Sequence, residues 1–242
     1  MNATSEYDFT IIVPLYNEQD NVPALEKRLA AYLPVCPMKA CVLFVNDGST
    51  DGSLGGLLEI CSRNKDFYYI DFKANYGLSA ALAAGFEAAQ SKYCGYMDAD
   101  LQTAPEDFDI LLEKIPDYSM VTGIRADRKD TAFKRLQSKI ANSFRRSMTG
   151  DGAVDTGCPL KVFHTDVVKR IPPFKGMHRF LPALVLMQGL NYAQVPVRHF
   201  PRTAGLSKYG LRGRFLGPLA DCFAYRWMKK RYTSYSIKSD NI

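Results

Sequence analysis

The sequence predicts an α/β fold, with a mostly parallel sheet flanked by helices and a basic amphipathic helical extension at the C-terminal end. Short apolar, β-rich runs alternate with helical patterns along the first half of the chain, an order typical of parallel strands joined by crossover helices. The 242 residues, 47% of them hydrophobic and 23% charged, suffice for one sizeable globular domain. Basic residues gather near the C-terminal end. Together these observations predict a domain at residues 1–210 and a basic tail at residues 211–242.

The expected elements follow one another in a regular order. Strands are predicted at residues 9–13, 41–45, 67–72, 93–97 and 120–123. Helices are predicted between them at residues 21–33, 53–61, 78–89 and 105–115. In the third of these helices Leu78, Leu82 and Phe86 recur at helical spacing, so we expect an apolar face against the sheet. The remaining chain is predicted to contain a basic helix at 132–148, Gly/Asp/Pro-rich turns, a helix at 180–188, a strand at 192–197 and a final basic, aromatic segment.

The net charge of +6 is a property of the C-terminal region. From Arg202 onward the chain has nine Lys and Arg residues against two acidic residues, so the rest of the chain is close to neutral. Such a segment favours an anionic partner, which is a phosphate, an anionic membrane or a nucleic acid. No nucleic-acid-binding motif is recognisable, so we expect no nucleic-acid partner. Basic and aromatic residues interleave between residues 211 and 232. This pattern allows a helix in a membrane interface or a terminal helix packed on its own domain.

The cysteines and the apolar runs indicate a cytoplasmic protein. The six cysteines form no CxxC pair, so we expect reduced thiols rather than a disulfide framework or a zinc site. The N-terminus has no basic start followed by an apolar stretch, and we read no signal peptide. No apolar run approaches the roughly 18 residues that span a bilayer.

Polar side chains follow four of the predicted strands, at the point where each strand ends. These clusters are residues 14–18 (PLYNE), 46–53 (NDGSTDGS), 98–102 (DADLQ) and 123–125 (GIR). The carboxyl ends of parallel strands meet at one edge of the sheet, where ligands of open α/β sheets bind. We therefore expect the four clusters to converge.

The aspartates at the end of the fourth strand predict a metal site. Asp98 and Asp100 provide hard oxygen ligands that suit Mg²⁺ or Mn²⁺ bridging a diphosphate. A second pair, Asp107 and Asp109, is expected to be solvated on a helix face. The DGSTDG stretch loosely resembles a calcium loop but lacks its closing Glu, and it is also a good turn. No G-x-G-x-x-G or Walker-type motif is present, so metal and side chains must hold the diphosphate.

At these residues the chain resembles family 2 glycosyltransferases of the GT-A fold, which is Rossmann-like. Within that family it is similar to the polyprenyl-phosphate sugar transferases, the subgroup of dolichol-phosphate mannose synthase. PLYNE, NDGSTDGS, NYGLSAALAAG and MDADLQ carry the family resemblance, although Asn46 replaces the first Asp of the second motif. GIR, VDTGCPLKVF and RTAGLSKYG carry the subgroup resemblance, which runs from about residue 10 to about residue 214.

The resemblance implies a role for each matching position. The nucleotide-sugar would be bound by Pro14, Tyr16, Glu18, Val45, Asp47, Asp98, Ala99 and Asp100. The metal would be bound by Asp100 and Gln102, and the acceptor phosphate by Arg125, Arg135, Ser138, Arg202 and Lys208. Asp98, Asp100, Arg125 and Arg135 are the predicted catalytic residues. The alternative for the two arginines is an ordinary surface position, solvated or salt-bridged.

The implied activity is the inverting transfer of a sugar from a nucleotide-diphosphate sugar to a polyprenyl phosphate, with Mg²⁺ or Mn²⁺ as cofactor. Many relatives continue into membrane-spanning helices and this chain does not. We therefore expect peripheral association with the inner face of the membrane, through an anionic surface or a small membrane-protein partner. One alternative is a family 2 enzyme with a saccharide acceptor in cell-surface polysaccharide synthesis, which needs an Asp or Glu base. Another is a non-catalytic nucleotide-binding module.

Overall fold

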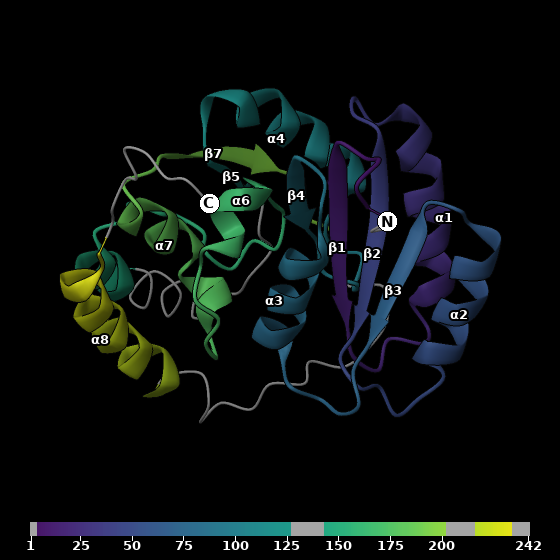
Figure 1. Ribbon diagram of the computed structural model, residues 1–242, viewed down its shortest axis with the longest axis horizontal. Helices are drawn as coiled ribbons and strands as arrows, with labels where there is room; N and C mark the ends of the chain where they lie inside the picture. Colours follow the sequence, from purple (N-terminus) through teal and green to yellow (C-terminus); the bar gives the residue numbers. More distant parts are fainter. Residues whose placement is uncertain (1–3, 127–142, 202–215, 234–242) are drawn as a thin grey trace, which may run out of the picture.

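The computed structural model describes residues 4–126, 143–201 and 216–233. Within these residues seven strands form one sheet (Figure 1). The strands are β1 (Phe9–Leu15), β2 (Ala40–Asn46), β3 (Phe67–Asp71), β4 (Tyr93–Tyr96), β5 (Met120–Arg125), β6 (Lys161–His164) and β7 (Tyr192–Val197). Four predicted acceptor-side residues lie outside the described residues, and they are Arg135, Ser138, Arg202 and Lys208.

The sheet has the order β3-β2-β1-β4-β6-β5-β7. All pairings are parallel except those of β6, which runs antiparallel to both β4 and β5. Every residue of β1 and β2 is buried, as expected for central strands covered on both faces. The predicted α/β fold with a mostly parallel sheet is confirmed, and β6 is the strand that the prediction lacks. Because β6 alone is reversed, the carboxyl ends of the other strands share one edge.

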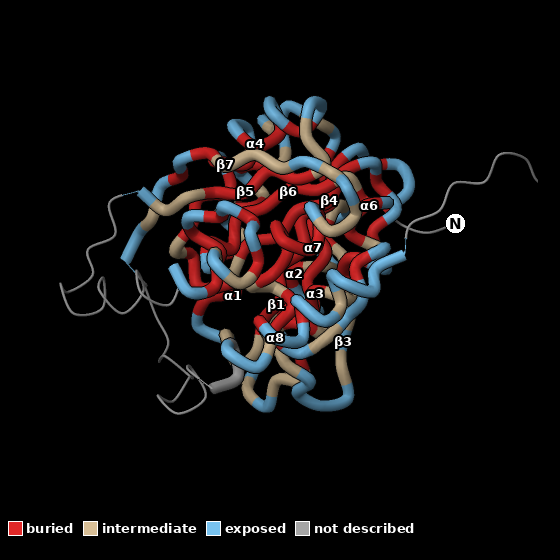
Figure 2. Tube along the Cα trace, turned by 90° about the vertical axis from the view of Figure 1, so that its left-hand side faces the viewer, coloured by how far each residue is buried: buried red, intermediate tan, exposed pale blue. Residues whose placement is uncertain are grey.

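Helices cover both faces of the sheet. One face carries α1 (Val22–Tyr32), α2 (Ser53–Arg63) and α4 (Phe108–Lys114), and the other carries α3 (Leu78–Ala88), α6 (Thr165–Lys169), α7 (Leu181–Met187) and α8 (Leu216–Arg231). The short 3₁₀ turns are η1 (Leu33–Val35), η2 (Pro105–Asp107), η3 (Ile115–Asp117) and η4 (Met177–Arg179). Residues 143–149 are also helical. Figure 2 shows the buried segments, with the strands among them, in the interior of the molecule and the exposed segments at its periphery.

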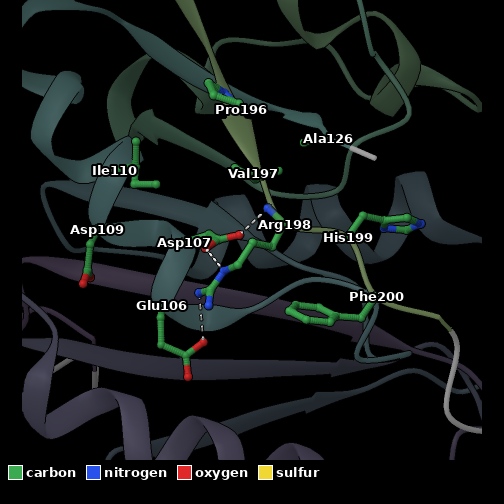
Figure 3. Close-up of a pocket in the computed structure, with 10 residues that line it drawn as sticks. All are labelled: Glu106, Asp107, Asp109, Ile110, Ala126, Pro196, Val197, Arg198, His199 and Phe200. Atoms are coloured by element: carbon green, nitrogen blue, oxygen red, sulfur yellow. Dashed lines mark hydrogen bonds and ion pairs between the residues drawn. The ribbon is translucent and has the colours of Figure 1, made fainter. Parts of the chain in front are cut away.

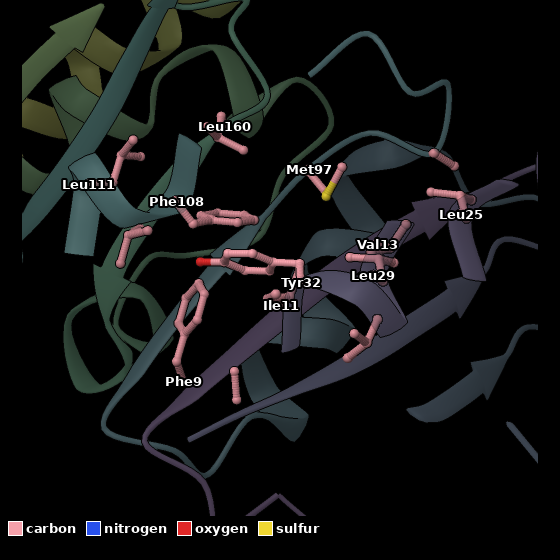
Figure 4. Packing of buried hydrophobic residues seen from close by; sticks show 14 of the residues in the cluster. Phe9, Ile11, Val13, Leu25, Leu29, Tyr32, Met97, Phe108, Leu111 and Leu160 are labelled. Carbon is pink, nitrogen blue, oxygen red and sulfur yellow. The ribbon is translucent and has the colours of Figure 1, made fainter. Parts of the chain in front are cut away.

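Aromatic packing fixes the α1–α4 face. In α1, Leu25, Leu29 and Tyr32 lie three or four residues apart and are fully buried, so they form one stripe against the sheet. The rings of Phe9 and Phe108 meet edge to face with centroids 5.2 Å apart, and Tyr32 stacks on Phe108 at 6.5 Å (Figure 4). This packing sets the distance between helices and sheet, and thereby positions the loops that leave β1 and β4.

The C-terminal helix α8 packs on the same core. Tyr225 of α8 is buried, stacks on Phe180 with centroids 6.0 Å apart, and donates its hydroxyl to the carbonyl of Ala183 at 3.1 Å. Among the helices that the structure describes, none is both long enough and apolar enough to cross a bilayer.

Candidate active site

The loops that follow β1 and β2 are joined by hydrogen bonds. The backbone N–H of Asn17 donates to Ser49 Oγ at 2.9 Å, and that of Glu18 donates to Ser53 Oγ at 2.8 Å. Asn17 Oδ1 accepts from the N–H of Thr50 at 2.8 Å. The predicted convergence of the PLYNE and NDGSTDGS clusters is therefore confirmed. The serines and the asparagine of these motifs join the two loops.

The residues predicted to bind the nucleotide lie at this edge of the sheet. Pro14 and Val45 are register partners on β1 and β2, and both are buried. Tyr16 and Glu18 are half-buried in the loop after β1. The Glu18 carboxylate accepts from Asn21 Nδ2 at 2.6 Å, which fixes it near the start of α1. Their position fits a ligand lying across the ends of these strands, while their roles remain predictions.

The Asp47 carboxylate holds a third loop. Its oxygens accept from the N–H groups of Tyr76 at 2.7 Å and Gly77 at 2.9 Å, and from Asn75 Nδ2 at 2.9 Å. Burial raises the pKa of Asp47, and the two backbone hydrogen bonds oppose that rise. Gly48 has φ +63°, and a Cβ there would overlap the backbone of Ala74. Asp47 and Gly48 thus bring the NYG motif to the end of β2, at the edge of the sheet where the predicted nucleotide-binding residues lie.

The DADLQ loop leaves the end of β4. Asp98 is half-buried, and Ala99 and Asp100 are buried. Leu101 has φ 58°, an uncommon left-handed conformation for a bulky residue. Asp100 Oδ1 accepts from the N–H of Gln102 at 3.2 Å across this turn. In the described part of the chain, Leu101 and Asn17 are the two non-glycine residues with positive φ. Both lie in predicted site loops, where strained backbone often accompanies function.

The donor set at this loop fits a divalent cation. In the described residues no three His, Cys, Asp or Glu side chains form a metal-binding group. Mg²⁺, however, is usually bound through one or two carboxylates, with waters and substrate phosphates as its other ligands. Asp100 and Gln102, with Asp98 nearby, supply that kind of partial set. The Gln102 backbone carbonyl accepts from the N–H of Phe200 at 2.9 Å, so the loop is held from the C-terminal side as well.

Arg125 ends β5 and pairs with Asp155, which lies in the VDTGCPLKVF stretch but was not itself predicted as a site residue. Its Nε and Nη2 donate to the two oxygens of Asp155, each at 2.8 Å. The side chains are 16% and 9% exposed. Burial lowers the pKa of Arg125, but the Asp155 hydrogen bonds and the charges of the Asp155 and Asp98 carboxylates outweigh it and raise that pKa. Arg125 is therefore salt-bridged, and its charge lies close enough to Asp98 to interact with it.

A fully buried lysine supports the segment that carries Asp155. Lys161 of β6 donates its ammonium to the carbonyls of Cys158 and Thr156 and lies 5.2 Å from the centroid of the Tyr96 ring. Burial lowers its pKa, while the nearby carboxylates of Asp155 and Asp98 act in the opposite direction. A lysine at a core position of a strand was not predicted. No sequence pattern distinguishes it from a solvated lysine.

A cavity of about 640 Å³ lies between the start of α4 and the end of β7 (Figure 3). Arg198 occupies its centre and donates its N–H and its Nε to the Asp107 carboxylate, both at 2.7 Å. Asp107 is 3% exposed, so the expectation of a solvated helix-face residue is wrong for it. The reason is Arg198, which is distant in sequence and neutralises the carboxylate. Asp109 is exposed, as expected.

A family model described as "Glycosyl transferase family 2" matches residues 10–171, more than half of the chain. The chain belongs to glycosyl transferase family 2. That membership confirms the family that the PLYNE, NDGSTDGS and DADLQ motifs indicated. The four described clusters of the site all lie within the matched residues.

Two relatives of this family 2 chain carry names of lipid-phosphate sugar transferases. A dodecaprenyl-phosphate galacturonate synthase of Rhizobium johnstonii is 30% identical over 214 residues, which are 86% of this chain and 63% of that protein. An undecaprenyl-phosphate 4-deoxy-4-formamido-L-arabinose transferase of Edwardsiella ictaluri is 33% identical over 204 residues, which are 84% of this chain and 63% of that protein. The chain thus spans a little under two thirds of the length of these relatives.

The family 2 chain also has the fold of solved glycosyltransferase structures. Glucosyl-3-phosphoglycerate synthase from Mycobacterium tuberculosis, in complex with Mn²⁺, UDP and glucosyl-3-phosphoglycerate, superimposes with a TM-score of 0.67. The match covers 96% of this chain and 83% of that chain at 11% identity. The same enzyme with Mn²⁺, UDP-glucose and phosphoglyceric acid gives a TM-score of 0.66. At these identities the likeness concerns the fold alone.

Proposed function

We propose that the chain transfers a sugar from a nucleotide-diphosphate sugar to a polyprenyl phosphate, with inversion at the anomeric carbon. The observation that carries this proposal is the arrangement at one edge of the sheet. Asp98 and Asp100 follow β4 there, and the cationic Arg125 ends β5. Metal-binding oxygens on one side and a guanidinium on the other fit a diphosphate donor and a phosphate acceptor. The two lipid-phosphate transferases at 30% and 33% identity support the acceptor class.

On the donor side, the loops after β1 and β2 bind the nucleotide, with Tyr16, Glu18 and Asp47 as the polar residues. A bound Mg²⁺ or Mn²⁺ would be held by Asp100 and Gln102, and would neutralise the charge that builds on the leaving diphosphate. Asp98 lies beside the ribose and the diphosphate. The complexes of the M. tuberculosis enzyme with Mn²⁺ and UDP-glucose, or with Mg²⁺ and UDP, support this choice of cofactor.

On the acceptor side, a phosphate oxygen attacks the anomeric carbon. The bond from that carbon to the β-phosphate oxygen breaks, and the nucleoside diphosphate leaves with the bonding electrons. The attacking oxygen is already anionic near neutral pH, so no general base is needed to remove a proton from it. Positioning is then the main requirement, and a guanidinium matches phosphate in two-pronged geometry. Arg125 supplies one such group, and Arg135, Ser138, Arg202 and Lys208 are proposed to complete the site.

The same proposal places the reaction at the cytoplasmic face of a membrane, where the hydrocarbon chain of the acceptor is embedded. The protein is proposed to attach there peripherally, because the basic charge from Arg202 onward favours an anionic surface. The relatives named after dodecaprenyl and undecaprenyl phosphates support a membrane-embedded substrate.

Thermal unfolding with a panel of nucleotide-sugars tests the donor site. The wild type is heated with UDP-, GDP- or ADP-sugars, with and without Mn²⁺, beside Asp100→Asn and the control Asp109→Asn. Asp109 is exposed and accepts from the Tyr32 hydroxyl at 2.8 Å, which an amide oxygen can also do. A ligand at about 100 times its Kd stabilises the folded state by about 2.7 kcal/mol, which raises Tm by several degrees.

We expect a metal-dependent rise in Tm with one nucleotide for the wild type and Asp109→Asn, and none for Asp100→Asn. A rise that persists in Asp100→Asn would contradict the metal assignment. The absence of any rise in the wild type would contradict the donor site itself.

A further inference from the structure

Helix α8 has two different faces. One face packs on the domain through Cys222 and Tyr225, which are 2% and 1% exposed. Tyr225 stacks on Phe180 and hydrogen-bonds to Ala183, so this face holds the helix on the domain. The sequence left open whether the segment packs on its own domain or lies on a membrane, and this face shows that α8 packs. Packing on the domain does not explain the composition of the opposite face of α8.

The opposite face carries a stripe of exposed apolar side chains. Leu219, Phe223 and Trp227 recur every fourth residue, so they lie in one line along the helix. Their exposed fractions are 37%, 62% and 61%. At 100° per residue this line lies roughly opposite Tyr225. Exposing a phenylalanine and a tryptophan one turn apart is unfavourable in water, and a row of this kind marks an interaction surface.

Among the described residues of α8, the charges that border this stripe are positive. Arg226 and Arg231 are exposed on its two sides and Lys230 at its C-terminal end, and the Arg231 guanidinium lies 4.9 Å from the centroid of the Trp227 ring. The single acidic residue of the helix, Asp221, lies toward the packed side, with its carboxylate 3.9 Å from Arg179. The surface is therefore apolar along its centre and cationic along its margins. Figure 1 shows α8 at the periphery of the molecule, where a large partner can reach it.

We propose that this face of α8 binds an anionic membrane surface. Apolar and aromatic side chains between cations are the composition of helices that lie in the interface of anionic bilayers. A second copy of the chain fits poorly, because a symmetric pairing of the same face would bring cations against cations. The inference deepens the proposed function and rests on it in one respect: the polyprenyl-phosphate acceptor supplies the reason for membrane attachment.

Vesicle sedimentation of the full chain tests the surface. The probes are vesicles of phosphatidylcholine alone and of phosphatidylcholine mixed with phosphatidylglycerol. We expect the wild type to bind the mixed vesicles and to release with salt. The variant F223S/W227S is expected to bind at least about ten-fold more weakly. The variant K230Q/R231Q is expected to bind about 25-fold more weakly, because each cation near an anionic surface contributes a factor of about five.

Matched control variants distinguish vesicle binding through this surface from nonspecific binding. V35S/L58S removes two exposed apolar side chains far from α8, and K27Q/K65Q removes two exposed lysines elsewhere. Both controls are expected to bind vesicles like the wild type. Equal binding by the α8 variants and their controls would overturn the proposal. So would wild-type self-association that the α8 variants abolish while their vesicle binding is unchanged.

Sugar transfer to polyprenyl phosphate dispersed in detergent distinguishes the surface from the proposed function. We expect F223S/W227S to keep transfer in detergent and to lose it on vesicles that contain the acceptor. If the wild type binds the mixed vesicles through α8 but transfers no sugar in either setting, the surface stands and the proposed function fails. If transfer on vesicles is the same in the variant and the wild type, the proposal for α8 is wrong.

Discussion

The Arg125 guanidinium and the Asp155 carboxylate form a two-pronged ion pair at the end of β5, with both N–O distances at 2.8 Å. The Asp155 carboxylate also accepts from the backbone N–H of Arg125 at 3.2 Å. The pair fixes the direction of the guanidinium before any phosphate arrives. Preorganised positioning of this kind lowers the entropic cost of bringing acceptor and donor together. Asp155 is thus a positioning residue for the proposed acceptor site.

Asp155→Asn removes the charge and keeps the size of the side chain. We expect the free energy of unfolding in urea to fall by about 3 kcal/mol, because a largely buried arginine is left unpaired. We also expect KM for the lipid phosphate to rise about ten-fold or more while KM for the donor changes little. The control is Asp166→Asn, which breaks an exposed ion pair with Arg170 at 3.0 Å and should cost under about 0.5 kcal/mol. Equal losses in the two variants would contradict the role of Asp155.

Replacing Gly48, in the loop that follows β2, can be compared with the same replacement of Gly55 in α2. Gly48→Ala puts a Cβ at φ +63° against the backbone of Ala74, so we expect a loss of at least about 2 kcal/mol in urea unfolding. Gly55 lies exposed in α2, where an added Cβ would meet nothing within 4 Å, so Gly55→Ala should stabilise by up to about 1 kcal/mol. The first variant should also weaken nucleotide binding. Losses of similar size in Gly48→Ala and Gly55→Ala would show that the close approach of Gly48 to Ala74 does not determine the stability.

His178 gives the stability a pH dependence. Its Nδ1 lies 3.0 Å from Ser79 Oγ, and that oxygen also accepts from the N–H of Gly176 at 2.9 Å. Burial, with the positive charges of Arg179 and Lys161, lowers the pKa of His178 to about 3 from the ordinary 6.5. The neutral imidazole is therefore the favoured form in the fold. The contribution of the neutral imidazole to the free energy of unfolding is complete above about pH 6.5 and is lost as the pH falls toward about 3.

The prediction for His178 is a difference between two unfolding series. Between pH 7 and pH 5 the wild type should lose up to about 2 kcal/mol more than His178→Asn, whose side chain does not titrate. Asn191→Ala serves as control, because it removes hydrogen bonds to Ser119 and Asp117 without removing a titratable group. The control should keep the wild-type pH dependence. A His178→Asn series parallel to the wild type would refute the buried neutral imidazole.

The parallel strands and the polar loops at their ends could be predicted from the sequence. β1 and β2 are continuous apolar runs, and the polar clusters after them come directly where the runs stop. β6 was missed because it has four residues and includes Lys161, whose burial depends on carbonyls supplied by another segment. A short strand that contains a lysine is indistinguishable from a loop until its neighbours are known.

The long-range partners of the site could not be predicted. Asp155 lies 30 residues after Arg125, and Arg198 lies 91 residues after Asp107. Each pairing depends on how strands and loops meet in space, so no local spacing indicates it. The same reason applies to Asp47. The motif predicts that it binds the nucleotide, but its hydrogen bonds to residues 75–77 become evident only once β2 and α3 are placed. The motifs predict where the site lies, and the tertiary contacts show how the loops at that edge of the sheet are held together.

The central claim is transfer to a lipid phosphate, and product analysis tests it most directly. The protein is incubated in detergent with undecaprenyl phosphate, Mn²⁺ and the nucleotide-sugar that stabilises it most, and the lipid fraction is characterised by mass spectrometry. The account predicts a glycosyl phospholipid whose formation stops when the metal is chelated and in Asp100→Asn, but not in Asp109→Asn. Consumption of the nucleotide-sugar with no sugar on the lipid, or transfer to a saccharide instead, would contradict it.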